Sequence, residues 1–222
     1  MVQQVRASIV SSTQLNDTIW RYILKPEQIV PYAAGQYLQV QRKDKDAQFY
    51  SIANAPQNAT YYELHVRHRD HQIWDARDMV SLSLPFGTCD LSHLHQDKPI
   101  LFLAVGTGFA PIRAMIEQLL WQADPRKMKL FWGVAVENDW YDPVSLQTWQ
   151  DQSSDFHYHP YLAAYHQSEL VAHVLARYPE VKDWQVVMAG PFELMHQFQQ
   201  KWLAQGLEKS VIFSDAFAFA SY

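Results

Sequence analysis

The sequence predicts two joined domains. An N-terminal antiparallel Greek-key β-barrel covers residues 1–96, and a doubly wound α/β domain with a parallel sheet covers residues 97–222. Short β-branched and aromatic stretches separated by turn residues fill the first half, whereas continuous apolar runs alternate with helical patterns in the second half. The polar stretch 91–98, which ends in Lys98-Pro99, marks the expected boundary.

The barrel is predicted from strands that repeat at short intervals. Each strand alternates in polarity or is rich in β-branched and aromatic residues, and polar, glycine or proline residues follow it. Connections this short suit antiparallel neighbours. The predicted strands cover residues 7–10, 18–24, 36–40 and 62–66, and a further strand is expected to end in the segment 48–54.

The second half follows a strand–helix alternation. The run from Ile100 to Val105 is apolar throughout, as expected for a strand buried on both faces, and the next segment places Ile112, Met115 and Leu119 on one helix face. The same pattern recurs to the end of the chain. Further strands are predicted at 128–134, 156–162, 184–189 and 211–213, and further helices at 143–150, 168–178 and 192–204.

Composition and charge exclude several classes of protein. The chain has 222 residues, of which 48% are hydrophobic and 18% charged, so a disordered chain and a membrane span are both excluded. The net charge of −5 gives no footprint for nucleic acid or anionic lipid, so small-molecule partners are expected. Cys89 is the single cysteine, which excludes an internal disulfide and a four-thiolate iron–sulfur cluster. The first twenty residues lack the apolar core of a signal peptide, so a cytoplasmic location is expected.

Two glycine-containing turns follow predicted parallel strands. The first, Gly106-Thr107-Gly108-Phe109-Ala110-Pro111, precedes a helix, whose first amides would face an anion. The second is Ala189-Gly190-Pro191-Phe192. The first turn lacks the third glycine of the dinucleotide fingerprint, so a purely structural turn is an equally good interpretation of it alone. Two such turns at one sheet edge would define a crevice.

A third motif, Gln48-Phe49-Tyr50-Ser51-Ile52-Ala53-Asn54, lies in the barrel half. It places two aromatic rings beside a hydroxyl at the end of a strand, where a flat ligand could stack. From the pattern alone, an aromatic pair that covers the barrel core is the simpler interpretation.

Together and in this order, these motifs resemble the ferredoxin–NADP reductase superfamily. The sequence is most similar to its stand-alone NAD(P)H:flavin oxidoreductases, and the resemblance spans nearly the whole chain. It rests on the three motifs above together with Ala33-Ala34-Gly35-Gln36-Tyr37-Leu38, Phe131-Trp132-Gly133 and Asp215-Ala216-Phe217-Ala218-Phe219.

The resemblance implies a flavin-binding barrel and an NAD(P)-binding α/β domain. Tyr50 would pack against the isoalloxazine, Ser51 would assist flavin N5, and Asp215 would orient a flavin or carboxamide group, so Ser51 and Asp215 are the implied catalytic residues. Implied flavin contacts are Gln48, Tyr50, Ser51, Ile52, Ala53, Asn54, His65, Val66, Arg67 and Phe217. Implied nucleotide contacts are Gly106, Thr107, Gly108, Phe109, Pro111, Gly133, Gly190, Pro191 and Phe192.

Departures from the family pattern shape the expected activity. Gln48 stands where many members carry a phosphate-binding arginine, and Arg67 stands where a glycine opens a phosphate-binding turn. Arg67 or Arg69 could replace the lost charge, but the simpler hypothesis is that FMN, FAD or riboflavin binds weakly as a substrate. Residues 134–142 contain no lysine or arginine to hold a 2′-phosphate, which favours NADH over NADPH.

The expected function is therefore hydride transfer from NADH, or NADPH, to N5 of a flavin that is then released. One alternative retains FAD and passes electrons to a redox partner protein. Another is a non-catalytic regulatory module that binds nucleotide. No metal site is expected, because His65 and His68 would point to opposite faces of one strand.

Overall fold

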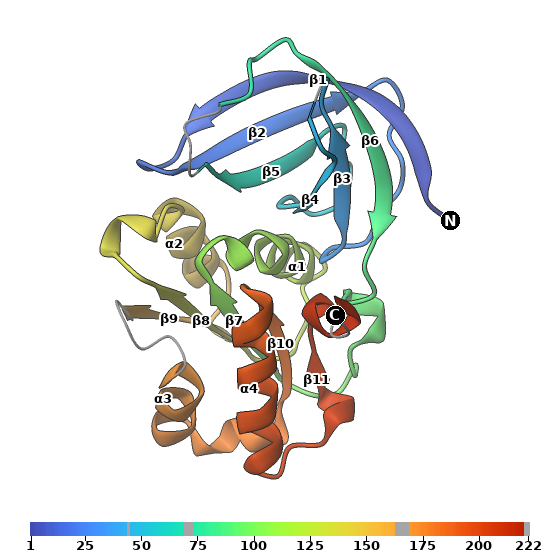
Figure 1. The fold of residues 1–222 in the computed structure, drawn as a ribbon. Coiled ribbons are helices and arrows are strands. Elements are labelled where there is room, and N and C mark those ends of the chain that lie inside the picture. Colours follow the sequence, from blue (N-terminus) through green and yellow to red (C-terminus); the bar gives the residue numbers. More distant parts are fainter. Residues whose placement is uncertain (44, 69–72, 163–168, 220–222) are drawn as a thin grey trace.

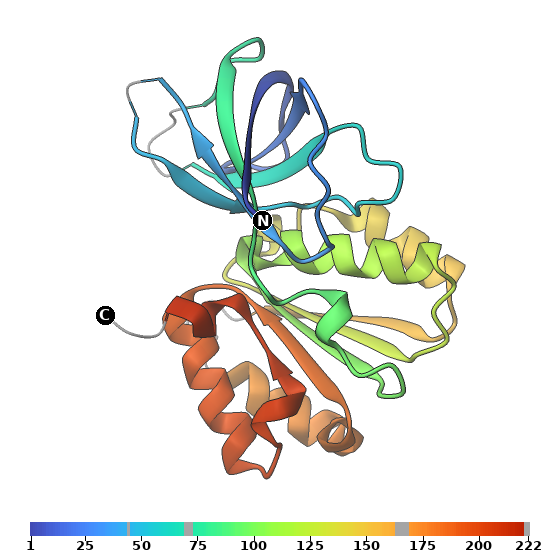
Figure 2. The same ribbon diagram turned by 90° about the vertical axis from the view of Figure 1, so that its right-hand side faces the viewer.

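The computed structural model describes residues 1–43, 45–68, 73–162 and 169–219, so Arg69 lies outside the described residues. The barrel and the α/β domain lie one against the other, with helix α1 (Phe109–Trp121) between the barrel and the parallel sheet (Figures 1 and 2). Among the described helices, none has the length and apolar character that a membrane crossing needs. This arrangement brings the carboxyl edge of the sheet close to the barrel.

The barrel is a nearly closed sheet of six antiparallel strands in Greek-key order β4-β3-β6-β1-β2-β5. The amide of Ala53, just beyond β4, donates to the carbonyl of Glu63 in β5 at 2.8 Å, so the two edge strands meet. The strands are β1 (Gln3–Gln14), β2 (Ile19–Pro26), β3 (Tyr37–Gln41), β4 (Gln48–Ser51), β5 (Tyr62–Arg67) and β6 (Met79–Phe86).

Strand β6 is absent from the strands predicted above, although its sequence alternates as a half-buried strand should. Val80, Leu82 and Leu84 are buried in the barrel core, while Met79 and Ser81 are exposed. The strand lies between β1 and β3, and this position makes the connectivity a Greek key.

The second domain has a five-stranded parallel sheet in the order β11-β10-β7-β8-β9. One apolar cluster joins α1 and α2 to one face, and a second joins α3 and α4 to the other, as in a doubly wound domain. The remaining elements are β7 (Ile100–Val105), β8 (Met128–Val134), α2 (Pro143–Gln152), β9 (Phe156–Leu162), α3 (Leu170–Arg177), β10 (Gln185–Ala189), α4 (Phe192–Ala204) and β11 (Ile212–Phe213).

A buried tyrosine ties a loop to the barrel wall. The Tyr62 hydroxyl accepts a hydrogen bond from the Val30 amide at 2.7 Å and donates one to the Val30 carbonyl at 3.0 Å, and the side chain is fully buried. A single side chain thus satisfies both backbone groups of a residue that lies outside the strands.

We expect Tyr62→Phe to lower the free energy of unfolding by about 1–3 kcal/mol, because it leaves a buried N–H and C=O without their partner. Urea unfolding followed by fluorescence measures the change. Tyr61→Phe is the matched control, since Tyr61 is 37% exposed. Equal stability of the two variants would contradict the prediction.

Candidate functional site

A cavity of about 820 Å³ lies between the two domains. It opens where the neighbouring strands β7 and β10 end. At this point the strand order reverses, because β8 and β9 lie on one side of β7, and β10 and β11 lie on the other. Ligands of doubly wound domains bind at such a switch point, and the volume is that of a small-molecule site. Barrel residues from β3, β4 and β5 form the opposite wall. The cavity is therefore shared by both domains.

The turn after β7 forms one wall. Gly106 has φ of +56°, which favours glycine, and a Cβ there would face open space apart from Arg67, whose Nη2 would lie 3.9 Å away. Gly108 packs so closely on the β10 exit that a Cβ would lie 2.1 Å from the Ala189 carbonyl oxygen. The Trp132 indole N–H donates to the Gly106 carbonyl at 2.9 Å. The backbone of Gly106, just before α1, is therefore accessible from the cavity and is fixed by the Trp132 hydrogen bond.

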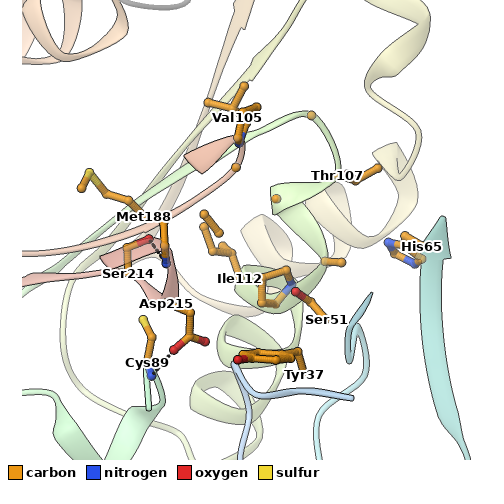
Figure 3. Close-up of a pocket in the computed structure, with 18 of the residues that line it drawn as sticks. Tyr37, Ser51, His65, Cys89, Val105, Thr107, Ile112, Met188, Ser214 and Asp215 are labelled. Carbon is orange, nitrogen blue, oxygen red and sulfur yellow. Dashed lines mark hydrogen bonds between the residues drawn. The ribbon is translucent and has the colours of Figure 1, made fainter. Parts of the chain in front are cut away.

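The barrel wall presents a hydroxyl flanked by aromatic rings. Ser51 lies opposite Tyr37 in the β3–β4 pairing, and both line the cavity with Phe49 (Figure 3). The Tyr37 ring stacks on Phe86 with centroids 5.7 Å apart, and the Phe49 ring meets Tyr37 edge-on at the same distance. Burial raises the pKa of the Tyr37 phenol, and the Asp215 carboxylate raises it further. This wall offers ring contacts and a neutral hydrogen-bonding group.

Tyr50 also borders the cavity, but its ring turns toward the barrel. It meets Trp74 edge-on with centroids 5.3 Å apart, and its hydroxyl donates to Gln48. Burial raises the pKa of Tyr50 to about 12, so the phenol is neutral at physiological pH. The structure thus places Tyr50 at the border between core and cavity.

Asp215 lines the cavity from the C-terminal side while holding the other domain. Its Oδ1 accepts hydrogen bonds from the amides of Thr88 and Cys89 at 2.9 and 3.0 Å (Figure 3). Burial raises the pKa of this carboxyl, although the two amides act in the opposite direction. The residue therefore already has a structural role in the segment that follows β6.

His65 and Arg67 reach the cavity from β5 and are both bound to neighbours. His65 Nε2 lies 3.0 Å from Glu63 Oε1, and its Nδ1 lies 3.1 Å from the Tyr141 hydroxyl. Burial lowers the pKa of His65, the Glu63 contact opposes this, and we assign the neutral ring. Arg67 forms an ion pair with Asp139 at 3.0 Å and so extends toward the α/β domain.

The predicted site residues divide into two groups. Those that line the cavity are Tyr50, Ser51, His65, Arg67, Gly106, Thr107, Gly108, Pro111, Gly190, Pro191, Phe192 and Asp215. Those that do not are Gln48, Ile52, Ala53, Asn54, Val66, Phe109, Gly133 and Phe217.

Packing and hydrogen bonds account for most of the second group. The amides of Ile52 and Ala53 donate to backbone carbonyls within the barrel. The Asn54 side chain binds the backbone of Tyr61 and Glu63. Three others pack in the interior: Val66 in the barrel core, Phe109 on Trp132 with centroids 3.9 Å apart, and Gly133 beside Leu170. Phe217 is partly buried and packs against His196.

Sequence reasoning missed several lining residues, of which Tyr37, Phe49, Cys89, Met115 and Asp139 are the most informative. Tyr37 and Phe49 lay inside quoted motifs, and the strand pattern places Phe49 on the same face as Ser51. The pairing of Tyr37 with Ser51 depends on strand register, which the motif does not reveal. Among the described residues, no cluster of three or more metal-ligating side chains occurs.

The residues present fit a flavin and a dinucleotide. The open backbone at Gly106 and the start of α1 suit a diphosphate, and the rings beside Ser51 suit a planar heterocycle. The two features lie on opposite walls of one cavity (Figure 3).

We expect Gly108→Ala to destabilise the α/β domain by about 1–3 kcal/mol, since the new Cβ would also lie 2.7 Å from the Gly190 amide nitrogen and the backbone must shift. Denaturant unfolding measures the loss. Gly133→Ala is the matched control, because its Cβ would meet Leu170 Cδ2 at 3.4 Å. A wild-type midpoint for Gly108→Ala would contradict the close packing of the two turns.

Comparisons with known proteins agree with this geometry. A family model described as an oxidoreductase NAD-binding domain matches residues 102–200. The chain is 25% identical over 235 residues to an NAD(P)H-flavin reductase of Vibrio harveyi, covering 97% of this chain and 99% of that protein. It is 28% identical over 217 residues to a CDP-6-deoxy-L-threo-D-glycero-4-hexulose-3-dehydrase reductase of Yersinia pestis, covering 87% of this chain but only 62% of the relative.

A solved structure shares the fold. The crystal structure of the Amycolatopsis cytochrome P450 reductase GcoB superposes with a TM-score of 0.85 at 19% identity, and the match covers 96% of this chain and 69% of that one. Because the match covers 96% of this chain, it includes both the barrel and the α/β domain. Residues 102–200 therefore match an oxidoreductase NAD-binding domain, and the chain as a whole is similar to reductases of the ferredoxin–NADP reductase type, NAD(P)H-flavin reductases among them, which implies NAD(P)H and a flavin as its cofactors.

Proposed function

We propose that the protein is an NADH:flavin oxidoreductase that reduces FMN, FAD or riboflavin and releases the reduced flavin. The observation that carries this proposal is that Ser51 on the barrel and the Gly106–Gly108 turn on the sheet face one cavity. A bound flavin supplies the acceptor for the two electrons and the proton that leave nicotinamide C4, and solvent supplies the second proton. The protein itself need provide no strong acid or base.

The chain's own residues bind and orient. The backbone at Gly106, Thr107 and Gly108 and the first amides of α1 hold the dinucleotide diphosphate. Ser51 offers a hydroxyl proton to the ring system against the barrel, while Tyr37 and Phe49 limit where that ring can lie. Holding two rings in contact makes the transfer effectively unimolecular, and this positioning is the main source of catalysis.

Two features of the barrel wall support a flavin that is a substrate. Gln48 is exposed and carries no charge, so it cannot hold a phosphate as arginine would. Arg67, the residue that could compensate, is held by Asp139 and by the Thr18 hydroxyl at 2.9 Å. A phosphate would have to compete with Asp139 for this guanidinium.

The segment after β8 supports NADH as the donor. Residues 134–142 include no lysine or arginine that could bind a 2′-phosphate, and the Glu137 carboxylate would repel that group, while the Asp139 carboxylate is already paired with Arg67. NADPH is the less favoured donor on this argument.

A second candidate retains FAD and delivers electrons to a partner protein. The similarity to the Yersinia reductase favours it, since that relative is named as the reductase of a dehydrase. Because the chain spans 62% of that relative, the match does not extend to the rest of its length.

Desalting and NADH absorbance distinguish these candidates. We expect the purified protein to lose flavin on desalting, and we expect NADH to be consumed only after FMN, FAD or riboflavin is added, with NADH preferred to NADPH. Consumption by a yellow, desalted protein with a one-electron acceptor would support retained FAD instead. If NADH is not consumed either without flavin or after each flavin is added, only the non-catalytic nucleotide-binding module would remain.

We expect Ser51→Ala to lower kcat by about 10- to 100-fold while the Kd for NAD⁺ stays unchanged, because the hydroxyl faces the flavin side of the cavity. Steady-state kinetics and calorimetric titration with NAD⁺ measure the two quantities. Ser8→Ala serves as control, since Ser8 lies on β1 and does not line the cavity. An unchanged kcat would remove Ser51 from the site.

A further inference from the structure

A buried arginine outside the cavity connects the two domains. Arg113 lies on α1, and its side chain is 13% exposed. Its Nη1 donates to the Ala53 carbonyl of the barrel at 2.9 Å, and its Nε donates to Asp142 Oδ2 at 2.8 Å. Its Nη2 lies 2.9 Å from Glu117 Oε1, one helical turn further along α1. One guanidinium therefore joins the barrel, α1 and the start of α2.

Glu117 makes a second contact with the same barrel segment. Its Oε2 accepts a hydrogen bond from the Ala55 amide at 3.2 Å, while Oε1 faces Arg113. Helix α1 therefore binds a backbone acceptor at Ala53 and a backbone donor at Ala55. Two contacts of opposite polarity fix both the position and the direction of this segment, which a single contact would not do.

The segment and the helix each lead directly into the cavity. Ala53 follows Ser51 by two residues, at the end of β4. In the other direction, Arg113 follows Gly108 by five residues along α1, which corresponds to about 7.5 Å of helix. The Arg113–Ala53 bond is thus a short, rigid link between the hydroxyl on one wall and the glycine turn on the other.

Stability alone does not explain this cluster. Glu63 Oε1 also lies 3.8 Å from Arg113, so three carboxylates surround one guanidinium in a largely buried place. Buried ion pairs of this kind are often no more stabilising than an apolar core, because the charges lose their hydration. What the cluster adds is a fixed geometry, since each contact requires one orientation of the two domains.

We propose that Arg113 and Glu117 are positioning residues that set the gap between the flavin wall and the nucleotide turn. Neither residue lines the cavity, so neither touches a ligand. The expected effect on rate rests on the proposed function. To that function the proposal adds that Arg113 and Glu117 align the two ligands. Their loss should therefore impair transfer between the ligands more than the binding of either one.

Arg113→Lys and Glu117→Gln test this proposal. Lysine retains the charge but concentrates its donors at one point, so it cannot keep the contacts to both Ala53 and Asp142. We expect kcat to fall about 10- to 100-fold, because a displacement near 1 Å has effects of that size. We expect the Kd for riboflavin alone, from fluorescence quenching, and for NAD⁺ alone, from calorimetry, to change by less than about two-fold.

Arg126→Lys is the matched control. Arg126 is also largely buried, with its side chain 6% exposed, and it also pairs with a carboxylate, Asp124 at 2.8 Å, but its hydrogen bonds do not reach the barrel strands. We expect its kcat to match the wild type. A similar fall in Arg126→Lys would indicate general damage and overturn the proposal. So would an unchanged kcat in Arg113→Lys, or a loss of affinity for one ligand as large as the loss of rate.

Amide hydrogen exchange separates this inference from the proposed function. The Ala55 amide should exchange faster in Arg113→Lys and Glu117→Gln than in the wild type and Arg126→Lys, whether or not the protein turns over. A wild type that consumes no NADH with any flavin would refute the function but leave this readout intact. Unchanged exchange across residues 53–55 would refute the positioning role itself.

Discussion

The site depends on helix α1, which must satisfy three neighbours at once. Its first turn follows Gly108, where only a hydrogen fits against the Ala189 carbonyl. Its apolar face, which includes Ile112 and Met115, is buried in the core that covers one face of the sheet. Its polar edge binds the barrel through Arg113 and Glu117. A shift of the helix would disturb all three, so the position of the nucleotide turn is fixed relative to the barrel.

The junction between the domains holds a buried polar network beside the apolar contacts that Ile19 and Ala34 of the barrel half make with the core around α1. Glu63, His65 and Tyr141 are buried there and hydrogen-bonded to one another, and burial lowers the pKa of His65 and raises that of the Tyr141 phenol well above its usual value. The neutral rings of His65 and Tyr141 therefore form a hydrogen-bonded chain with the Glu63 carboxylate and add no charge to it. Apolar contacts tolerate sliding, whereas these hydrogen bonds hold only at one separation, so the polar network favours a defined cavity over maximal stability.

The sequence predicts the strands and helices of this molecule better than the side-chain contacts that line its cavity. Apolar runs such as Ile100–Val105 identify parallel strands because burial on both faces removes alternation. The glycine turn is visible because its backbone requirement is local. In contrast, the partners of Asp215 are the amides of Thr88 and Cys89, more than 120 residues away, and no local pattern encodes that contact. The direction of the Tyr50 ring is equally hidden, because it depends on the packing of Trp74.

The two walls of the cavity would hold their ligands by different physical means. The sheet wall offers backbone amides and a helix N-terminus, which attract a diphosphate without a charged side chain. Arg67 on the barrel wall is paired with Asp139, and Asp215, which lines the cavity from the α/β domain, is bound to two amides, so both charges already have partners. Ring contacts with Tyr37 and Phe49 remain, and these do not distinguish flavins by their phosphates. An acceptor held in this way can leave after reduction, because no ion pair has to break for its release.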